Sequence, residues 1–194
     1  MDKSVLISIR PEWCELIASG EKTIEVRKTF PKLNVPSKVY IYCTQGSDML
    51  WILKPEDRKL FPEKPTDVFT AKDAGGAYRG NGSVIGEFTC DTYVIDKTFG
   101  HDPLFNVAAC MSEDDAADYA AGSPLYGWHI SNLKIYDTPR ELDDFRRICK
   151  NDWWCDSCAM YWEHNGTCGN ASLQIRRPPQ SWCYVEVREC IPIR

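Results

Sequence analysis

Hydrophobic and polar positions near the start of the chain follow a strand, helix, strand pattern. Residues 3–9 are rich in β-branched and apolar side chains, which predicts a strand. Pro11 suits the first turn of a helix, apolar residues recur behind it at three- and four-residue spacing, and Gly20 suits the helix end. Residues 23–27 then alternate, so Ile24 and Val26 should point to one side of a second strand.

Later segments add more predicted strands than helices. The alternation and turn signals predict strands at 39–43, 83–95 (a long strand or a hairpin, with a bulge at Gly86), 126–136 and 181–188. Helices are predicted at 112–121, capped by Ser112 and closed by Gly122, and from the capping-box pattern at 138–141. Residues 46–82 lose periodicity and are interpreted as a loop insertion with at most one short helix. Helices between strands, without regular β-α-β alternation, favour a β-rich α+β fold built on a small mixed barrel.

Size and composition indicate one globular domain spanning residues 1–194. The chain is 43% hydrophobic and 26% charged, and no apolar run approaches the roughly 20 residues that span a bilayer. No signal architecture stands at the N-terminus, so we expect a cytoplasmic protein with no membrane partner. The net charge of −5 argues against an indiscriminate nucleic-acid binder. Residues 1–40 and 146–194 each carry seven basic and five acidic residues, so any basic face is local.

Three charged residues stand at the junction of the first helix and the second strand. Glu25 and Arg27 should share the strand face opposite Ile24 and Val26, with Lys22 arriving from the turn. Such a trio is either a solvated face or a polar site. If it lines a cleft, the carboxylate should orient both cations, and the excess positive charge suits an anionic or hydrogen-bond-rich planar ligand such as a nucleotide.

The segment from Gly20 to Arg27 resembles the signature of the ASCH domain, a member of the PUA-like superfamily. Gly20, Lys22, Glu25 and Arg27 match the motif residue for residue. Further resemblance lies in Gly86-Glu87-Phe88, in Tyr126-Gly127-Trp128-His129-Ile130, and in 178–184, which is similar to a longer subgroup from bacterial and phage genomes. The resemblance implies a small PUA-like β-barrel with a few flanking helices, interrupted by insertions at about 46–82 and 147–172.

The same resemblance implies two classes of function. The leading hypothesis is an RNA- or nucleotide-binding protein that uses Lys22, Glu25 and Arg27, with Trp128 and Trp182, besides Trp13, as stacking surfaces if they are not core residues. The alternative is a hydrolase acting on RNA or on a modified nucleoside, with Lys22 and Glu25 as catalytic residues. One ASCH-like branch hydrolyses N4-acetylcytidine through the motif Lys, a Thr three residues later and a Glu from elsewhere in the fold. In this chain the position of the Thr is Glu25, so this part of the machinery is missing.

Four of the ten cysteines crowd into twenty residues and form what we call the cysteine cluster. Its members are Cys149, Cys155, Cys158 and Cys168. The Cys-x2-Cys pair is typical of a tetrahedral zinc site, and an insert of this size has little core of its own. We therefore expect a structural Zn²⁺ on these four thiolates, with His164 as the alternative fourth ligand and reduced, unmetallated cysteines as the other interpretation. The dispersed cysteines, such as Cys43, are interpreted as small buried hydrophobes.

A third class of function stays open beside binding and hydrolysis. The cysteine-rich insert and residues 46–82 could form an interaction module for a protein partner that the sequence does not identify. Basic and aromatic residues converging on one cleft would favour the first two classes, and an exposed apolar insert beside a filled cleft would favour the third.

Overall fold

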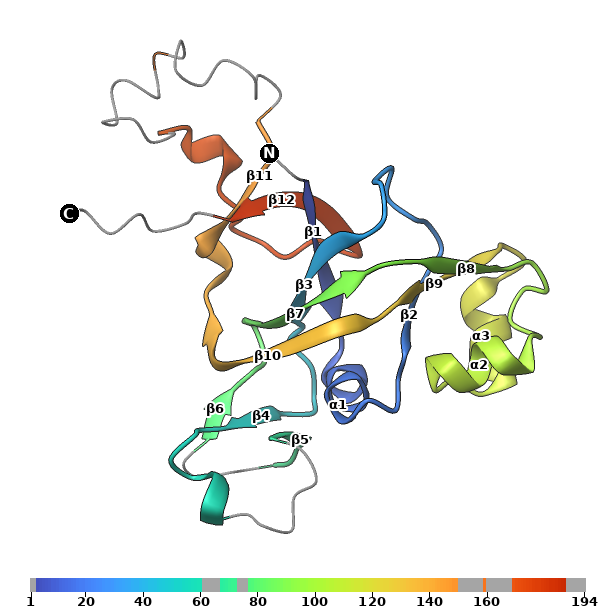
Figure 1. The fold of residues 1–194 in the computed structure, drawn as a ribbon, viewed down its shortest axis with the longest axis horizontal. Coiled ribbons are helices and arrows are strands. Elements are labelled where there is room, and N and C mark those ends of the chain that lie inside the picture. The colour runs from blue at the N-terminus through green and yellow to red at the C-terminus, as the bar shows by residue number, and fades with distance from the viewer. Residues whose placement is uncertain (1–2, 61–66, 73–76, 150–158, 160–168, 188–194) are drawn as a thin grey trace.

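The computed structural model describes residues 3–60, 67–72, 77–149, 159 and 169–187. Its strands form three sheets, and its helices sit between them along the chain (Figure 1). The strands are β1 Ser4–Ile9, β2 Ile24–Arg27, β3 Ser37–Cys43, β4 Leu50–Leu53, β5 Val68–Thr70, β6 Ala77–Arg79, β7 Val84–Cys90, β8 Tyr93–Asp96, β9 Leu125–His129, β10 Ser131–Arg140, β11 Phe145–Arg147 and β12 Trp182–Val187. The α-helices are α1 Pro11–Ser19, α2 Pro103–Ala109 and α3 Glu113–Ala120, and the 3-10 turns are η1 Arg58–Leu60, η2 Leu142–Asp144 and η4 Ala171–Leu173.

The largest sheet has six strands in the order β10-β7-β3-β1-β12-β11. β1 and β3 run parallel, with Val5 opposite Val39, and the other neighbours are antiparallel. Alternate side chains of β1 enter two different cores: Val5 and Ile7 face the larger core, and Leu6 faces a smaller one on the opposite side of the sheet. Burial on both faces explains why residues 3–9 form an apolar run rather than a polar and apolar alternation.

A second sheet, in the order β2-β9-β8, positions the motif residues. Ile24 and Val26 pack with α2 and α3 in a third core, which confirms the predicted alternation of β2. On the opposite face, Glu25 pairs in register with Trp128, and Arg27 pairs with Tyr126. Figure 1 shows α2 and α3 beside this sheet, at one end of the molecule.

The segment from 46 to 82 contains a third sheet, so the prediction of a loop with at most a short helix was wrong. β4 pairs antiparallel with both β5 and β6, and η1 follows β4. Leu50 and Ile52 enter the larger core, and the Thr70 hydroxyl donates a 2.6 Å hydrogen bond to Glu15 of α1. The strands are three or four residues long, too short to show alternation above the turn residues around them.

Two other local predictions need correction, and one helix was missed. The run 126–136 is divided between β9 and β10, which belong to different sheets. β10 continues to Arg140, where a helix was expected, and only the η2 turn follows. The helix α2 was not predicted at all. α3 begins after Ser112 as predicted, and the two residues that follow it, Ala121 and Gly122, both have the left-handed conformation.

The β-rich α+β class and the predicted N-terminal elements are confirmed. α1 ends at Gly20 in the left-handed conformation, and the register of β3 on β7 shifts beside Gly86, where a bulge was predicted. The described strands form three sheets, and no closed ring of strands is found among them. Most of the cysteine-rich insert at 147–172, namely residues 150–158 and 160–168, lies outside the described residues.

Candidate functional site: a pocket around Lys22, Glu25 and Arg27

The turn between α1 and β2 directs Lys22 inward. Gly20 has a φ of 82°, which a residue without a Cβ adopts at little cost, and its N–H bonds the Ile17 carbonyl at 3.1 Å. The Lys22 N–H then bonds the Leu16 carbonyl at 3.0 Å, so the chain turns back across the end of the helix. Thr23 continues by donating its N–H to Ala108 of α2. These bonds carry the Lys22 side chain below the protein surface.

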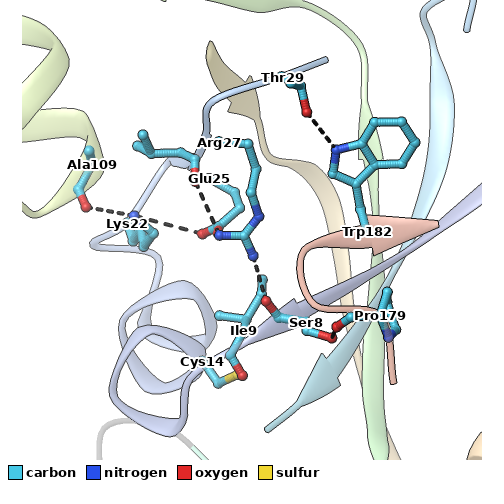
Figure 2. A network of polar contacts seen from close by, with 11 residues as sticks. Ser8, Ile9, Cys14, Lys22, Glu25, Arg27, Thr29, Ala109, Pro179 and Trp182 are labelled. Carbon is cyan, nitrogen blue, oxygen red and sulfur yellow. Dashed lines mark hydrogen bonds and ion pairs between the residues drawn. The ribbon is translucent and has the colours of Figure 1, made fainter. Parts of the chain in front are cut away.

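Lys22 is a buried cation, with only 3% of its surface exposed. Its Nζ donates a 2.7 Å hydrogen bond to the carbonyl of Ala109, at the C-terminal end of α2, where the helix dipole favours positive charge (Figure 2). It lies 3.8 Å from Glu25 Oε2 and 4.8 Å from the centre of the Trp13 ring. Burial lowers the pKa of Lys22, and the carboxylate of Glu25 opposes part of that shift.

Glu25 and Arg27 form a largely buried ion pair, so the solvated-face interpretation of the trio was wrong. Arg27 Nη1 lies 2.8 Å from Glu25 Oε1, and the two side chains are 14% and 4% exposed. Arg27 Nη2 also donates to the Ser8 carbonyl at 2.5 Å, which ties β2 to the end of β1 (Figure 2). Within the described residues, two buried atoms of the pair, Glu25 Oε2 and Arg27 Nε, make no hydrogen bond. An unused acceptor and an unused donor therefore belong to the same ion pair.

All three residues line one pocket with a volume of about 730 Å³, within the usual range for small-molecule sites. The end of β1 and the start of α1 form one wall, and β2 forms another. Residues 178–181 form a third wall, which Ser8 holds through a 2.6 Å bond from its hydroxyl to the Pro179 carbonyl and a 2.9 Å bond from its N–H to Ser181. The charged residues of the lining are Arg10, Lys22, Glu25, Arg27 and Asp115, which leaves one net positive charge.

The wall formed by Met111, Asp115 and Tyr119 was not predicted. Tyr119 lies on α3, is 37% exposed, and has Lys28 Nζ 5.4 Å from its ring centre. An aromatic ring beside a cation, on a pocket wall, offers a stacking surface for a planar ligand. The sequence predicted the helix that carries Tyr119, but the packing of that helix beside the motif depends on α2.

Trp128 and Trp182 do not line the pocket. Trp128 is fully buried in the larger core, between Phe30 and Trp182, so it has no free face for a ligand and the stacking prediction was wrong for it. Trp182 is half-buried, packs on Trp128 and Tyr184, and donates its Nε1–H to Thr29 at 3.1 Å (Figure 2). Trp13 does line the pocket, beneath Lys22.

The predicted zinc ligands cannot be placed from the described residues. Cys155, Cys158, Cys168 and the alternative ligand His164 lie outside them, and Cys149 is a half-buried free thiol. The part of the chain that the structure describes holds no group of three His, Cys, Asp or Glu residues arranged for a metal ion. Of the dispersed cysteines among the described residues, Cys14, Cys43 and Cys90 are buried as predicted, whereas Cys110 and Cys183 are only half-buried.

Comparison with known proteins places the segment that carries the charged trio in a family. The profile of the ASCH domain family matches residues 7–95, which include Gly20, Lys22, Glu25 and Arg27. The chain contains an ASCH domain. The resemblance inferred from the motif is thereby confirmed, and ASCH domains are generally RNA-binding or hydrolase-like.

Solved structures agree on the fold. The crystal structure of ASCH from Zymomonas mobilis matches with a TM-score of 0.54 and 18% identity, over 94% of this chain and 87% of that one. A point variant of the same Zymomonas mobilis protein matches with a TM-score of 0.53 and 18% identity, over 94% and 90% of the two chains. At this identity the likeness concerns the fold alone. No curated protein matches the chain. Among the described residues, no helix is long and apolar enough to cross a membrane.

Proposed function

We propose that the ASCH domain of this chain binds RNA or a nucleotide-like ligand in the pocket lined by Lys22, Glu25 and Arg27. The observation that carries the proposal is that Glu25 Oε2 and Arg27 Nε make no hydrogen bond within the described residues, and that Oε2 has only Lys22 Nζ near it, at 3.8 Å. A buried polar atom without a partner costs free energy, and a ligand that supplies one donor and one acceptor relieves that cost. The edge of a nucleobase carries donors and acceptors side by side.

Other parts of the lining fit the same ligand. The single net positive charge favours a ligand with a phosphate. Tyr119 and Trp13 supply aromatic faces, and base stacking on an aromatic side chain is worth about 1–3 kcal/mol. The volume of about 730 Å³ admits a nucleotide and excludes a base-paired duplex, so the RNA that enters should be single-stranded.

Hydrolysis is the second candidate, and the state of Lys22 favours it. A lysine whose pKa is lowered by burial is a better general base or nucleophile at neutral pH than an exposed lysine. In that case Lys22 would either attack the scissile bond of the substrate as a nucleophile or deprotonate the attacking water as a general base. The Glu25 carboxylate, 3.8 Å away, would orient the Lys22 amine. The substrate would be RNA or a modified nucleoside such as an N4-acylcytidine. Glu25 replaces the Thr expected of the acetylcytidine-hydrolysing branch, so binding remains the leading proposal.

Binding is tested by titrating the pure protein with single-stranded tetranucleotides and with the four nucleoside 5′-monophosphates in calorimetry. Tyr119→Ala should weaken binding about 5- to 150-fold, the equivalent of one stacking interaction. Tyr93→Ala is the matched control, because Tyr93 is 40% exposed but does not line the pocket. Arg27→Lys, which keeps the positive charge but loses the forked hydrogen-bond donors of the guanidinium, should also weaken binding. Equal affinities in wild type and Tyr119→Ala would contradict the proposal.

Turnover is tested separately by incubating the protein with an RNA digest and with N4-acylated cytidines, followed by mass spectrometry. New products that disappear in Lys22→Arg, while tetranucleotide binding persists, would establish the hydrolase. If the protein binds these compounds but leaves them chemically unchanged, it is a binding domain and not a hydrolase. If no nucleotide or RNA binds at all, the pocket proposal fails and the interaction module becomes the leading alternative.

Two further expectations from the sequence stay proposals. We propose that residues 1–194 form a single domain and that the cysteine cluster holds one structural Zn²⁺. The cytoplasm remains the predicted location, and no protein partner is identified.

A further inference from the structure

We propose that β8 is the contact surface for a second copy of this chain, which pairs with it through its own β8 in the antiparallel direction. The sheets of β2, β9 and β8 from the two copies then join into one continuous sheet across a two-fold axis. This inference is independent of the proposed function, because no residue of β8 lines the pocket.

The first observation is the unpaired edge of β8. It is an outer strand of its sheet, and no described strand lies beyond it (Figure 1). Thr92, directly before β8, accepts the N–H of His129 opposite it on β9. Because hydrogen bonds alternate along an antiparallel ladder, Tyr93 and Ile95 turn their backbone N–H and C=O groups away from β9. Within the described residues these groups make no hydrogen bond, so they are available to another strand.

The second observation is the apolar character of this edge. Tyr93, Val94 and Ile95 are consecutive in the strand and are 40%, 49% and 42% exposed. The Tyr93 ring stacks on Phe30, with the ring centres 4.1 Å apart, so it is held in place before any partner binds. Natural edge strands are protected from pairing by charged residues, prolines or bulges, and residues 93–95 contain none of these. The edge is therefore suited to pairing with a strand of another chain.

Pairing of β8 with itself satisfies both observations. With Val94 on the two-fold axis, Tyr93 of each copy stands opposite Ile95 of the other, and their open backbone groups exchange hydrogen bonds. An aromatic side chain opposite a β-branched one is a pair that stabilises antiparallel sheets. Val94 meets Val94 of the second copy at the axis, so no charge is buried at the centre of the contact.

The charges at the two ends of β8 favour a second copy as the partner. The register centred on Val94 places Asp91 opposite Lys97 of the second copy, and the two-fold axis repeats this pair. Both residues are exposed, and Asp91 Oδ1 lies 2.6 Å from His129 Nδ1, which holds the carboxylate beside the strand. A register shifted by two residues in either direction loses both charge pairs. The charges therefore select the register that also pairs the apolar residues.

The test measures the mass of the full chain by sedimentation velocity over a concentration series, in a reducing buffer so that none of the ten cysteines links two chains. We expect an equilibrium between monomer and dimer with a dissociation constant in the micromolar range. Val94→Lys should abolish the dimer, because it places two cations together on the axis. Leu104→Lys is the matched control, because Leu104 is exposed and apolar but lies on α2.

Charge reversal distinguishes self-pairing from pairing with any other strand. Lys97→Asp and Asp91→Lys should each weaken the dimer about 5- to 30-fold, because two attractive contacts become repulsive. An equimolar mixture of the two variants should dimerise about as well as wild type, since each mixed dimer again contains two pairs of opposite charge. Amide exchange gives an independent readout: the N–H groups of Tyr93 and Ile95 should exchange more slowly as the protein concentration rises.

Each outcome supports or overturns the inference. A wild-type chain that stays monomeric up to about 1 mM would overturn it. A dimer that Leu104→Lys weakens as much as Val94→Lys would place the contact on α2 and would also overturn it. If mixing the two charge variants does not restore the dimer, β8 does not pair with itself. Nucleotide binding should persist in Val94→Lys, so a failure of the dimer and a failure of the proposed function are observed separately.

Discussion

Removal of the Glu25 carboxylate should destabilise the fold far more than removal of an exposed carboxylate. With an effective dielectric constant of about 20, the attraction is about 6 kcal/mol for Arg27 at 2.8 Å and about 4 kcal/mol for Lys22 at 3.8 Å. Much of this gross attraction is offset by the free-energy cost of removing Glu25 itself from water, which is several kcal/mol. Because Glu25→Ala leaves two buried cations without a carboxylate, a net loss of about 3–5 kcal/mol is expected.

The low end of that range is the better expectation, because both cations keep hydrogen bonds to carbonyl groups. Lys22 retains Ala109, and Arg27 retains Ser8. A loss of about 3 kcal/mol corresponds to a fall in melting temperature of about 6–12 °C for a chain of this length. Urea denaturation followed by tryptophan fluorescence, together with thermal melts followed by circular dichroism, measures both quantities without any ligand.

The same variant should show a pH dependence with a defined sign. The pKa of Lys22 is lowered by burial in the folded protein, and removal of Glu25 takes away the group that opposes that shift. The unfolded chain therefore binds a proton more readily than the folded chain, so stability rises with pH. The loss of stability that comes from burying a charged Lys22 is fully present at a pH below the pKa of Lys22 in the folded protein. It disappears as the pH approaches 10.5, the ordinary pKa of a lysine. The deficit of Glu25→Ala relative to wild type should shrink between pH 7 and pH 10.

Asp67→Ala provides the matched control. Asp67 pairs with Arg58, and the two side chains are 38% and 54% exposed, so the loss of this pair should cost about 0–1 kcal/mol. If Glu25→Ala costs no more than Asp67→Ala at pH 7, the trio is not desolvated and the description of the pocket as a buried charged site is wrong. If the difference in unfolding free energy between Glu25→Ala and wild type stays constant from pH 7 to pH 10, Lys22 is not the cause of that difference.

Three further predictions concern other parts of the molecule. Gly86→Ala should cost about 1–3 kcal/mol in urea denaturation, because its Cβ would lie 2.5 Å from the backbone oxygen of Lys134; Gly46→Ala, whose nearest contact would be 3.5 Å, should be near neutral, and equal costs would contradict the close approach. Burial raises the pKa of Cys90 to about 11, so about one thousandth of it is thiolate at pH 8. Native iodoacetamide labelling read by mass spectrometry should therefore reach the half-buried Cys110 before Cys90. Protein purified without chelators should carry about one equivalent of zinc on the cysteine cluster by elemental analysis and lose it on acidification; metal-free protein with all four thiols freely alkylated would refute this.

Local chemistry determined the elements at the start of the chain, from β1 to β2. The β1 strand, the Pro-led helix α1 and its end at Gly20 depend on propensity and on backbone conformation within a few residues, and all three agree with the structure. The alternation of β2 likewise separated Glu25 and Arg27 from Ile24 and Val26. The motif that identifies the ASCH family lies in this segment, which is why the family could be inferred before the structure.

Helix α2 shows where sequence patterns fail. It has seven residues, and its exposed Leu104 and Val107 are as apolar as its buried Phe105 and Ala109, so the sequence shows no division into an apolar and a polar face. Its Ala109 carbonyl nevertheless holds Lys22, and its packing on β2 places α3 beside the pocket. The burial of the trio, and the use of Tyr119 in the lining, therefore depend on contacts between residues nearly 90 positions apart.

The tryptophans show the same limit in the opposite direction. A tryptophan in a strand has the same sequence signature whether its ring faces a core or a ligand, because both environments are apolar. Only the stacking of the sheet of β2, β9 and β8 against β1 and β12 buried Trp128 completely and left Trp13 in the pocket wall. The sequence by itself thus determined the family, the elements from β1 to β2 and the identity of the charged trio. The tertiary structure decided that the trio is buried and which side chains surround it, because desolvation depends on distant segments meeting in space.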